Sequence, residues 1–543
     1  MKRFKLFLAM AALACAIGLT VKYGSTYRPV VEPVREIEEI WALEDAREES
    51  GEPLVTRLFC NGIPMAYDAE NNVFYGSLGL ENGAQWPEIK LTASEETAKG
   101  LSLCFADDYG FDDCDAAIRE GYSYQIFAYT DTAYSYAEVV FTGLPLVNVT
   151  ADQTIEREDV PAQIEIALAA EGLQTNGRIH KRGGASILND KVGYKLEFTR
   201  TTDGKKKIYR EIPGMGTDSQ VILLPMNALD TTMMRDRLSW ALYARLTRRD
   251  EPFSARKTQY CELFLNGEYR GVYLMLEPFS VRQEVAKAGE ERLTTDSVYR
   301  TAVISLSHGR PCMEDPYSAA TGFELYYPMD VEPDFSPLAD YFALLGETDD
   351  AAFMRRAAQI IDLDSALRYD VVLQLFGLTD NVINNMYTWA QNSRGHTRYR
   401  FDFWDLDVSW GLKRDEIGEM HENWVFFPLV DRLLRADEEG GVRQRYGEIY
   451  REVREKAFDT ETVEALVGQY AHELNDSGAM ARNAERWETE NYAADGYELV
   501  AFAAERIALL DEPVRAMSAG EEIDLRFLEK TNYDDKGTPL SEE

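Results

Sequence analysis

Short runs of alternating apolar and polar residues fill the chain between about residues 53 and 147. Alternation with a period of two places successive side chains on opposite faces of an extended segment, as in a half-buried strand. Asn-Gly, Asp-Asp and single glycines separate these runs, and the runs are rich in tyrosine and phenylalanine. This pattern predicts an all-β, sandwich-like domain whose aromatic residues serve mainly in packing.

Further strands follow from residue 151. In the stretch 191–198, Tyr194, Leu196 and Phe198 share one face, whereas lysines occupy the other. The clearest local pattern is at 261–278, where two apolar strands flank an Asn-Gly pair. That pair is the preferred turn of a two-residue β-hairpin, so the segment predicts a hairpin.

Helical periodicity marks three other regions. Residues 230–249 have an apolar stripe and a basic end, with Asp230 placed to cap the start of the helix. An apolar helix within 363–391 should end near Gly377, and a strand resumes at 399. Residues 424–517 keep heptad-like apolar spacing, which predicts a helical C-terminal region.

These patterns divide the chain into six consecutive parts. They are a targeting segment, a charged linker, a β domain, a mixed α/β domain, a helical part and a polar tail, at residues 1–28, 29–50, 51–150, 151–415, 416–517 and 518–543.

The N-terminus is typical of an exported protein. Three basic residues, Lys2, Arg3 and Lys5, precede an apolar run from Leu6 to Val21. An uncleaved membrane anchor, a cleaved signal peptide and lipid attachment at Cys15 are the three interpretations, in that order of preference. Each places the rest of the chain outside the cytoplasm.

The charge is strongly acidic, with 94 Asp and Glu residues against 57 Lys and Arg residues and a formal net charge of −37. Such a field repels nucleic acid and anionic lipid, so a nucleic-acid partner is excluded as the working hypothesis. A site for a polyanion such as ATP would need local positive charge or a metal ion.

The cysteines and histidines carry no metal-binding spacing. Cys104 and Cys114 would close a small disulfide loop in an oxidising compartment, and buried thiols are the equal alternative. The sequence contains no nucleophile elbow and no His-Glu-x-x-His helix, so hydrolase mechanisms lack support.

One constellation suits phosphoryl transfer, which needs metal on the phosphates, a nearby cation and a carboxylate that orients the attacking hydroxyl. Asp380 and Asn385 have the five-residue separation of a kinase catalytic loop and follow an apolar helix. Asp405 and Asp407 follow the next predicted strand, where the second metal carboxylate of a kinase lies. Either of these two aspartates fits the metal-ligand position.

The upstream half has the order of a kinase small lobe: a strand with lysine, a helix, then two antiparallel strands ending at Glu277. Lys191 and Lys195 are the alternative phosphate-contacting lysines, and Arg182 precedes a Gly-Gly pair whose backbone amides suit phosphate.

Four segments together resemble the spore coat protein H (CotH) kinase family, over roughly residues 165 to 517. They are LLPMNALDTTMMRDRLSWALYARL, ELFLNGEYRGVYLMLEPF, LTDNVINNMYTW and FDFWDLDVSWG. The resemblance implies an α+β fold: an atypical protein-kinase-like two-lobed domain, with its small lobe ending near residue 280. An N-terminal all-β domain would precede it, and a C-terminal helical extension would follow.

The resemblance also implies roles for residues. Asp380 would be the catalytic base, Asn385 and Asp405 would bind metal, and Asp407 would share or support that metal. Lys191 matches the family's phosphate-contacting position, with Lys195 as its rival. The implied reaction uses ATP with Mg²⁺ or Mn²⁺ and modifies Ser or Thr of a protein at the cell or spore surface. An inactive, pseudokinase-like scaffold is the alternative.

Overall fold

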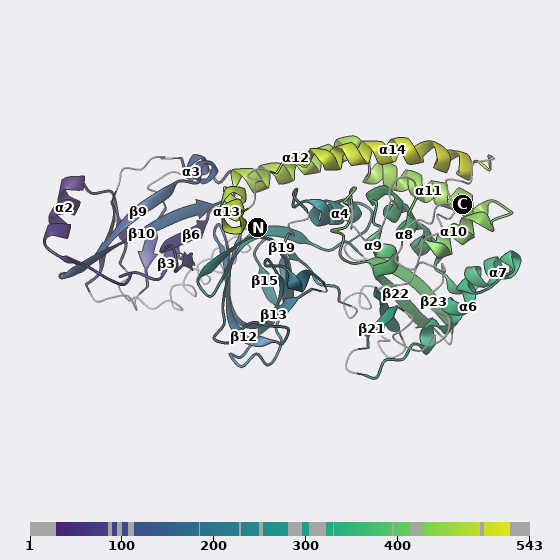
Figure 1. The fold of residues 1–543 in the computed structure, drawn as a ribbon, viewed down its shortest axis with the longest axis horizontal. Helices are drawn as coiled ribbons and strands as arrows, with labels where there is room; N and C mark the ends of the chain where they lie inside the picture. The colour runs from purple at the N-terminus through teal and green to yellow at the C-terminus, as the bar shows by residue number, and fades with distance from the viewer. Residues whose placement is uncertain are drawn as a thin grey trace, which may run out of the picture. The chain divides into compact units, whose positions relative to one another are not determined.

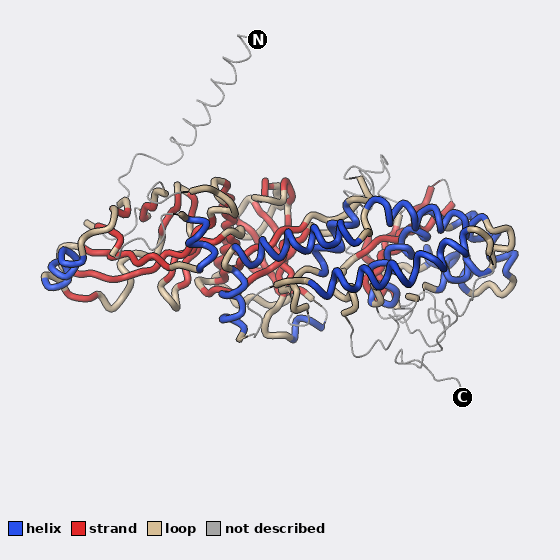
Figure 2. Tube along the Cα trace, turned by 90° about the horizontal axis from the view of Figure 1, so that it is seen from above, coloured by secondary structure: helices blue, strands red, loops and turns tan. Residues whose placement is uncertain are grey.

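The computed structural model describes residues 29–84, 89–94, 100–106, 113–183, 185–226, 230–248, 254–280, 296–302, 322–328, 331–393, 396–412, 424–425, 427–488 and 494–521. This chain is a mixed α+β protein, and its contacts divide it into two compact units. The first unit comprises residues up to 223 with 260–273 and 473–492, and the second comprises 224–259, 274–472 and the residues from 493 on. Strands dominate the first unit, and helices dominate the second (Figure 1, Figure 2).

The N-terminal part of the first unit consists of two sheets that share a hydrophobic core. One has the strand order β1-β8-β9-β10-β6-β5, with β2 paired to β10, and the other has the order β4-β3-β7. Leu58, Phe74 and Ile126 come from different strands and are fully buried in this core. The strands are Val31–Glu32, Glu48–Glu49, Leu58–Cys60, Ile63–Pro64, Ala66–Asp68, Val73–Ser77, Leu91–Ala93, Ser102–Phe105, Ser123–Tyr129 and Ala133–Thr142 (β1 to β10), and α3 is Cys114–Glu120.

Residues 29–50 are not the linker that their charge predicts. They form β1, helix α2 (Ile37–Asp45) and β2, and the two strands pair with β8 and β10. Ile40 is fully buried and packs with Phe127 of β9. The burial of this apolar side of α2 outweighs the many exposed acids, and therefore the segment folds onto the β domain.

A closed barrel with the order β11-β12-β13-β14-β17-β19-β18 forms the rest of the first unit. Tyr194, Leu196 and Phe198 of β14 are buried, as the alternation predicts. The hairpin turn has φ 54° at Asn266 and 78° at Gly267, which confirms the predicted hairpin between β18 and β19. The strands are Leu146–Thr150 (β11), Val160–Leu168 (β12), Glu171–Arg182 (β13), Gly193–Thr199 (β14), Gln220–Leu224 (β17), Thr258–Leu265 (β18) and Glu268–Leu276 (β19), and a small pair is Arg210–Ile212 (β15) and Gly216–Asp218 (β16).

Helix α13 (Ala479–Trp487) belongs to the first unit although it lies far along the chain. Arg482 on this helix donates from Nε and one terminal nitrogen to the carboxylate of Glu262 on β18, over 2.9 and 2.8 Å. Tyr269 on β19 donates its hydroxyl to the same carboxylate over 2.7 Å. This buried pair anchors the C-terminal segment to the barrel.

The second unit contains a four-stranded sheet of order β21-β20-β22-β23 and a group of helices. Helix α8 ends at Phe376, and Gly377 takes the left-handed conformation, φ 65°, as its C-terminal cap. The strands are Ser297–Ala302 (β20), Phe323–Tyr327 (β21), Asn384–Ser393 (β22) and His396–Phe403 (β23), and the helices are Arg235–Ala244 (α4), Ala339–Leu345 (α6), Asp350–Ile360 (α7), Leu363–Phe376 (α8), Asp380–Ile383 (α9), Pro428–Arg435 (α10), Gly441–Lys456 (α11), Thr460–Asp476 (α12, which continues into the first unit) and Tyr497–Ser518 (α14).

Cys104 and Cys114 are not joined by a disulfide. Cys104 packs in the small cluster with Ile40, whereas Cys114 lies in the core shared by the two sheets. Alternation along β8 explains this separation, because Leu103 and Phe105 point into the shared core and Cys104 between them points away from it.

The predicted targeting segment, residues 1–28, and most of the predicted tail lie outside the described residues. None of the helices within the described ranges combines the length and the apolar character needed to cross a membrane.

Candidate functional site

The structure brings together Asp380 and Asn385, the two residues predicted from their spacing. Helix α9 starts at Asp380 and ends one residue before β22, which begins at Asn384. The Asn385 side-chain amide donates to the Asp380 carboxylate with an Nδ2–Oδ2 distance of 2.8 Å. Both side chains are buried, so this contact occurs in a medium where charge is poorly screened.

The backbone is strained at two of the predicted metal ligands. Asn385 has φ 58° and Asp405 has φ 57°, both in the left-handed region. Asn and Asp enter this region more readily than other residues with a Cβ, yet the conformation still costs about 1 kcal/mol or more. Strain of this kind concentrates at functional sites, where it aims a side chain that regular structure would point elsewhere.

Asn381 connects the Asp380 turn to the Asp405 segment. Its side-chain amide donates to the carbonyl of Trp404 over 2.7 Å, and its own carbonyl accepts the Tyr369 hydroxyl over 2.7 Å. Tyr369 in turn stacks on Phe403, with 4.1 Å between ring centroids. The turn after α8 and the end of β23 are therefore held together at the residues that flank Asp380 and Asp405.

The oxygen chemistry of these residues suits a divalent cation. Mg²⁺ prefers oxygen ligands and is usually held by one or two carboxylates together with substrate phosphates. Among the described residues, no three His, Cys, Asp or Glu side chains converge as a metal site. In this same part of the chain, Oδ1 of Asn381 is buried and accepts no hydrogen bond, which leaves one further oxygen beside Asp380.

Arg300 on β20 places a positive charge near Asp405. Its guanidinium pairs with Glu324 on β21 over 2.6 Å. Burial lowers the pKa of Arg300, but the hydrogen bond and charge of Glu324, with smaller contributions from Tyr387 and Asp405, outweigh burial and raise the pKa overall. Sequence reasoning missed this arginine because it lies far from both motifs, and the pairing of β20 with β22 brings it near.

Helix α4 supplies two contacts to the segment after Asp405 that the motifs do not predict. The Asp236 carboxylate accepts the backbone N–H of Leu406 over 3.0 Å, and the Ser239 hydroxyl accepts the indole N–H of Trp410 over 2.8 Å. The helix starts later than predicted: α4 begins at Arg235, and its N-cap is Met234, which makes no side-chain capping hydrogen bond. The Asp230 carboxylate lies before the helix and accepts the N–H of Arg235 over 3.2 Å.

The predicted lysines belong to the first unit. Lys191 donates its ammonium to the Val272 carbonyl over 2.6 Å and to the Asn483 amide oxygen over 2.9 Å. It also lies 5.0 Å from the ring centroid of Tyr273. Burial lowers the pKa of Lys191 to about 7, with a further decrease from Arg270 and an increase from Cys261. The Lys191 ammonium is thus bound within its own unit.

Lys195 belongs to the same unit, where the acidic Glu197 and Asp159 as well as basic residues surround it. It pairs in register with His180, two residues before Arg182 on β13. Burial lowers the pKa of Lys195, and the charges of Lys207 and Arg182 contribute to this decrease. Within the described ranges, Lys195 makes no ion pair or hydrogen bond through its side chain. Arg182 and Lys195 therefore lie close together, whereas Lys191 is engaged elsewhere.

Glu277 and Asp407 have other contacts. The Glu277 carboxylate accepts the N–H of Lys257 over 3.1 Å, and its own N–H donates to the Lys257 carbonyl, which closes the open end of the hairpin. The Asp407 carbonyl accepts the N–H of Ser409 over 3.1 Å, and its side chain is half-buried.

An aspartate–asparagine pair follows α8, and a further aspartate follows the paired strands β22 and β23. Protein kinases likewise carry a catalytic aspartate, a metal-binding asparagine and a later metal-binding aspartate. Comparison of the sequence with protein families also indicates a kinase-like protein. The chain belongs to the CotH kinase family, described as CotH kinase protein, whose model matches residues 179–510. This match includes every site residue discussed above. A comparison with curated proteins gave no significant match.

Proposed function

We propose that this protein is an atypical kinase that transfers the γ-phosphoryl group of ATP, with Mg²⁺ or Mn²⁺, to a Ser or Thr hydroxyl of another protein. The observation that carries the proposal is the hydrogen-bonded pair of Asp380 and Asn385, tied through Asn381 to the segment that bears Asp405. Family membership supports the kinase class, and the local geometry supports the particular roles.

In the proposed reaction, the bond between the γ-phosphorus and the β–γ bridging oxygen breaks, and a bond forms between that phosphorus and the substrate hydroxyl oxygen. The bridging oxygen leaves with ADP, and the hydroxyl proton passes to the Asp380 carboxylate. The divalent ion, when bound, neutralises charge on the phosphates. Asn385 and Asp405 would hold that ion, and the Asn385 amide keeps Asp380 oriented.

The proposed site also needs positive charge, because ATP must enter a protein whose net charge is −37. Within the second unit, Arg300 supplies such a charge next to Asp405.

We further propose that the protein acts outside the cytoplasm, held there or exported by its N-terminal segment. The basic residues Lys2, Arg3 and Lys5 before the apolar run support this location. The substrate would be a protein at the cell or spore surface.

The test measures phosphate transfer by mass spectrometry of a mixed protein substrate incubated with ATP and Mn²⁺. The wild-type chain should add phosphate to Ser or Thr, and Asp380→Asn should abolish the transfer with little change in melting temperature. Glu505→Gln is the matched control, because Glu505 is an exposed acid on α14 without a contact in the described structure. A product that carries a nucleotide would replace phosphoryl transfer with nucleotidyl transfer.

An inert, pseudokinase-like scaffold is the second candidate, and the contacts of Lys191 favour it. An ammonium already bound by Val272 and Asn483 is poorly available to phosphate. ATP with Mn²⁺ should raise the melting temperature of an active kinase, and Asp405→Asn should remove that increase. Absence of both the increase and the transfer would favour the scaffold.

A further inference from the structure

Two neighbouring residues of opposite charge, at the start of α4, hold the segment that follows Asp405. Asp236 accepts the N–H of Leu406, the residue between the two predicted metal aspartates. Arg235 donates from Nε to the carbonyl of Ser409 over 3.1 Å. The first turn of α4 thus contacts this segment at a backbone donor and at a backbone acceptor.

The segment needs such support because its own conformation is strained at both ends. Asp405 has φ 57° and Trp410 has φ 52°. Within the segment, the Ser409 hydroxyl donates to the Leu406 carbonyl over 2.6 Å. Neither end is in a regular helix or strand, so contacts from other elements hold the segment. They come from α4, from the Asn381 amide at Trp404, and from the Phe376 carbonyl, which accepts the N–H of Trp410 over 2.8 Å.

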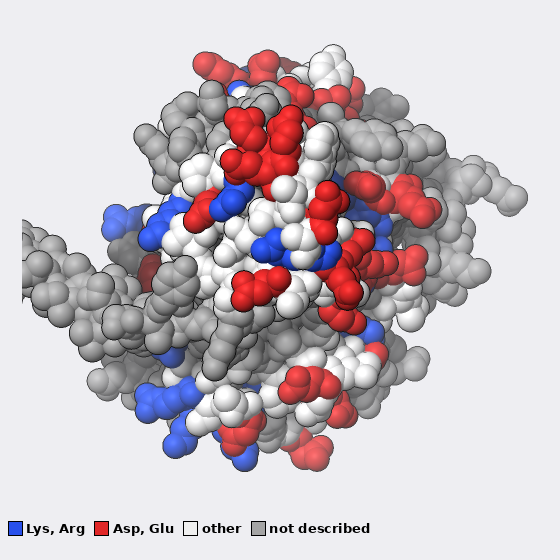
Figure 3. Space-filling model, turned by 90° about the vertical axis from the view of Figure 1, so that its left-hand side faces the viewer, with Lys and Arg blue, Asp and Glu red and all other residues white. Residues whose placement is uncertain are grey.

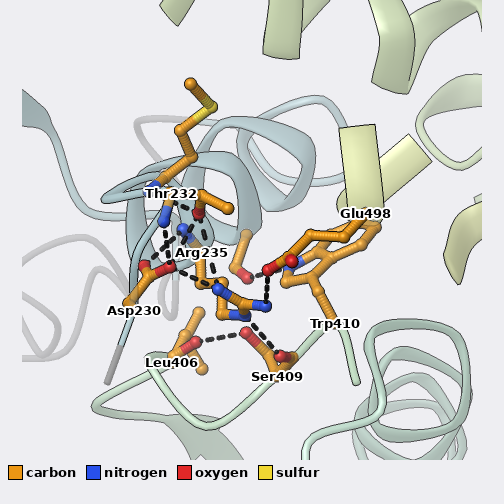
Figure 4. Close-up of polar contacts among 9 residues, drawn as sticks. Asp230, Thr232, Arg235, Leu406, Ser409, Trp410 and Glu498 are labelled. Atoms are coloured by element: carbon orange, nitrogen blue, oxygen red, sulfur yellow. Dashed lines mark hydrogen bonds and ion pairs between the residues drawn. The ribbon is translucent and has the colours of Figure 1, made fainter. Parts of the chain in front are cut away.

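Arg235 extends this support to a distant part of the chain (Figure 4). Its guanidinium is buried, with 5% of the side chain exposed, and it forms ion pairs with Asp230 and with Glu498 of α14. The pair with Glu498 spans 2.5 Å, and 53% of the Glu498 side chain is exposed. A buried cation is thus neutralised in part by a carboxylate at the surface.

We propose that Arg235 and Asp236 are positioning residues for Asp405 and Asp407, and that Glu498 is the point through which α14 controls them. This inference rests on the proposed function. Loss of the Glu498 charge leaves Arg235 with Asp230 as its remaining carboxylate partner in the described structure. The guanidinium is then drawn toward Asp230 and its bond to Ser409 weakens. The metal-binding segment becomes mobile without any change in a metal ligand.

The first test is hydrogen exchange of the full-length chain, followed in the peptide that covers residues 404–412. Glu498→Gln should increase the exchange of this peptide several-fold, because the segment opens more often. Glu498→Asp, which keeps the charge, should restore most of the protection. Glu505→Gln removes the same charge from the same helix and should leave this peptide unchanged. Equal exchange in Glu498→Gln and Glu505→Gln would overturn the proposal.

The second test measures the Mn²⁺ concentration that gives half-maximal phosphate transfer. Outer partners of metal ligands typically change metal affinity by about 10-fold or more, so Glu498→Gln should raise this concentration by about that factor. The KM for ATP at saturating Mn²⁺ should change much less. An unchanged Mn²⁺ requirement, with exchange of the peptide increased, would also overturn the proposal.

The two tests separate this inference from the function on which it rests. A wild-type chain that binds neither ATP nor Mn²⁺ refutes the proposed kinase activity. The exchange experiment then still decides whether Glu498 holds the Asp405 segment, since it needs no ligand.

Discussion

Asp370 lies inside α8 as a carboxylic acid with no cationic partner among its described contacts. Tyr446 donates its hydroxyl to one carboxylate oxygen over 2.8 Å, and Gln374 donates to the other over 3.2 Å. Burial raises the pKa of Asp370 to about 7, against the lowering effect of these two hydrogen bonds. At a pH between the ordinary aspartate pKa and about 7, Asp370 is therefore protonated in the folded state and ionised in the unfolded state.

The raised pKa of Asp370 determines the direction in which stability changes with pH. Between about pH 4 and about pH 7 the folded state carries one more proton than the unfolded state, so the free energy of unfolding falls as the pH rises. The Asp370 contribution is on the order of 4 kcal/mol over this range. We expect Asp370→Asn to be more stable than the wild type above pH 7, with the difference disappearing near pH 4. Urea unfolding at several pH values measures it.

Asp364 on the same helix is the matched control. It is exposed, and its pKa is lowered, first by the hydrogen bond from Arg445. A lowered pKa contributes stability at neutral pH that is lost on acidification. Asp364→Asn should therefore change stability modestly and in the opposite direction. Two variants with the same pH slope would contradict the assignment to Asp370.

At the scale of residues, the sequence indicated that Asp380 and Asn385 lie together in the candidate site, but it did not indicate the contacts of Lys191. Five positions separate Asp380 and Asn385, and one helix end with one strand start is enough to bring them together. The partner of Lys191 could not be found in the same way. Asn483 is 292 residues away, and no local pattern indicates that it returns to Lys191.

At the scale of elements, a buried ion pair attaches helix α13 to the barrel. Glu262 is fully buried and receives hydrogen bonds from Arg482 and Tyr269. Replacing the charge with an amide leaves the Arg482 guanidinium buried without a counter-charge. We expect Glu262→Gln to lower the free energy of unfolding of the first unit by about 3–5 kcal/mol. Urea unfolding, with hydrogen exchange of residues 479–487, measures it.

An exposed ion pair in the same unit is the control. Lys205 and Asp203 are both largely exposed, so Lys205→Gln should change the free energy of unfolding far less than Glu262→Gln. Similar losses in the two variants would show that the buried pair does not anchor α13.

Local signals predicted the elements that depend on one or two residues. Gly377 ends α8 because its left-handed conformation costs glycine little, and Asn266-Gly267 fixes the hairpin by the same property. The prediction of a linker at 29–50 was wrong because the many acidic residues of this segment obscure the short apolar side of helix α2 in the sequence. Ile40 finds its partner on a strand almost 90 residues later, which charge and proline content do not reveal.

At the scale of the whole molecule, mutual repulsion among the many acidic side chains destabilises the folded state. Acidic side chains gather in patches on the face drawn in Figure 3, in keeping with the net charge of −37. Repulsion among these groups weakens when salt shortens their range to about 8 Å at about 0.15 M. We expect the melting temperature to rise as NaCl is added from low ionic strength.

Divalent cations provide the comparison. MgCl₂ and NaCl at the same ionic strength screen these charges in the same general way. Any additional rise in melting temperature with MgCl₂, measured without ATP, therefore reports Mg²⁺ binding at acidic groups. Asp405→Asn should reduce that additional rise if the candidate site contributes, and should leave the NaCl effect unchanged. A melting temperature that falls with NaCl would show that attractive ion pairs outweigh the repulsion.

The closed barrel also imposes an order on synthesis. Strands β11 and β17 are made before β18 and β19, the strands that occupy their open edges, and α13 leaves the ribosome later still. Until then, a growing chain presents unsatisfied backbone groups and apolar surface to any neighbouring chain. Nascent chains of this protein would accordingly depend on a chaperone through much of translation. Nearly the whole polypeptide must be synthesised before the first unit can fold completely.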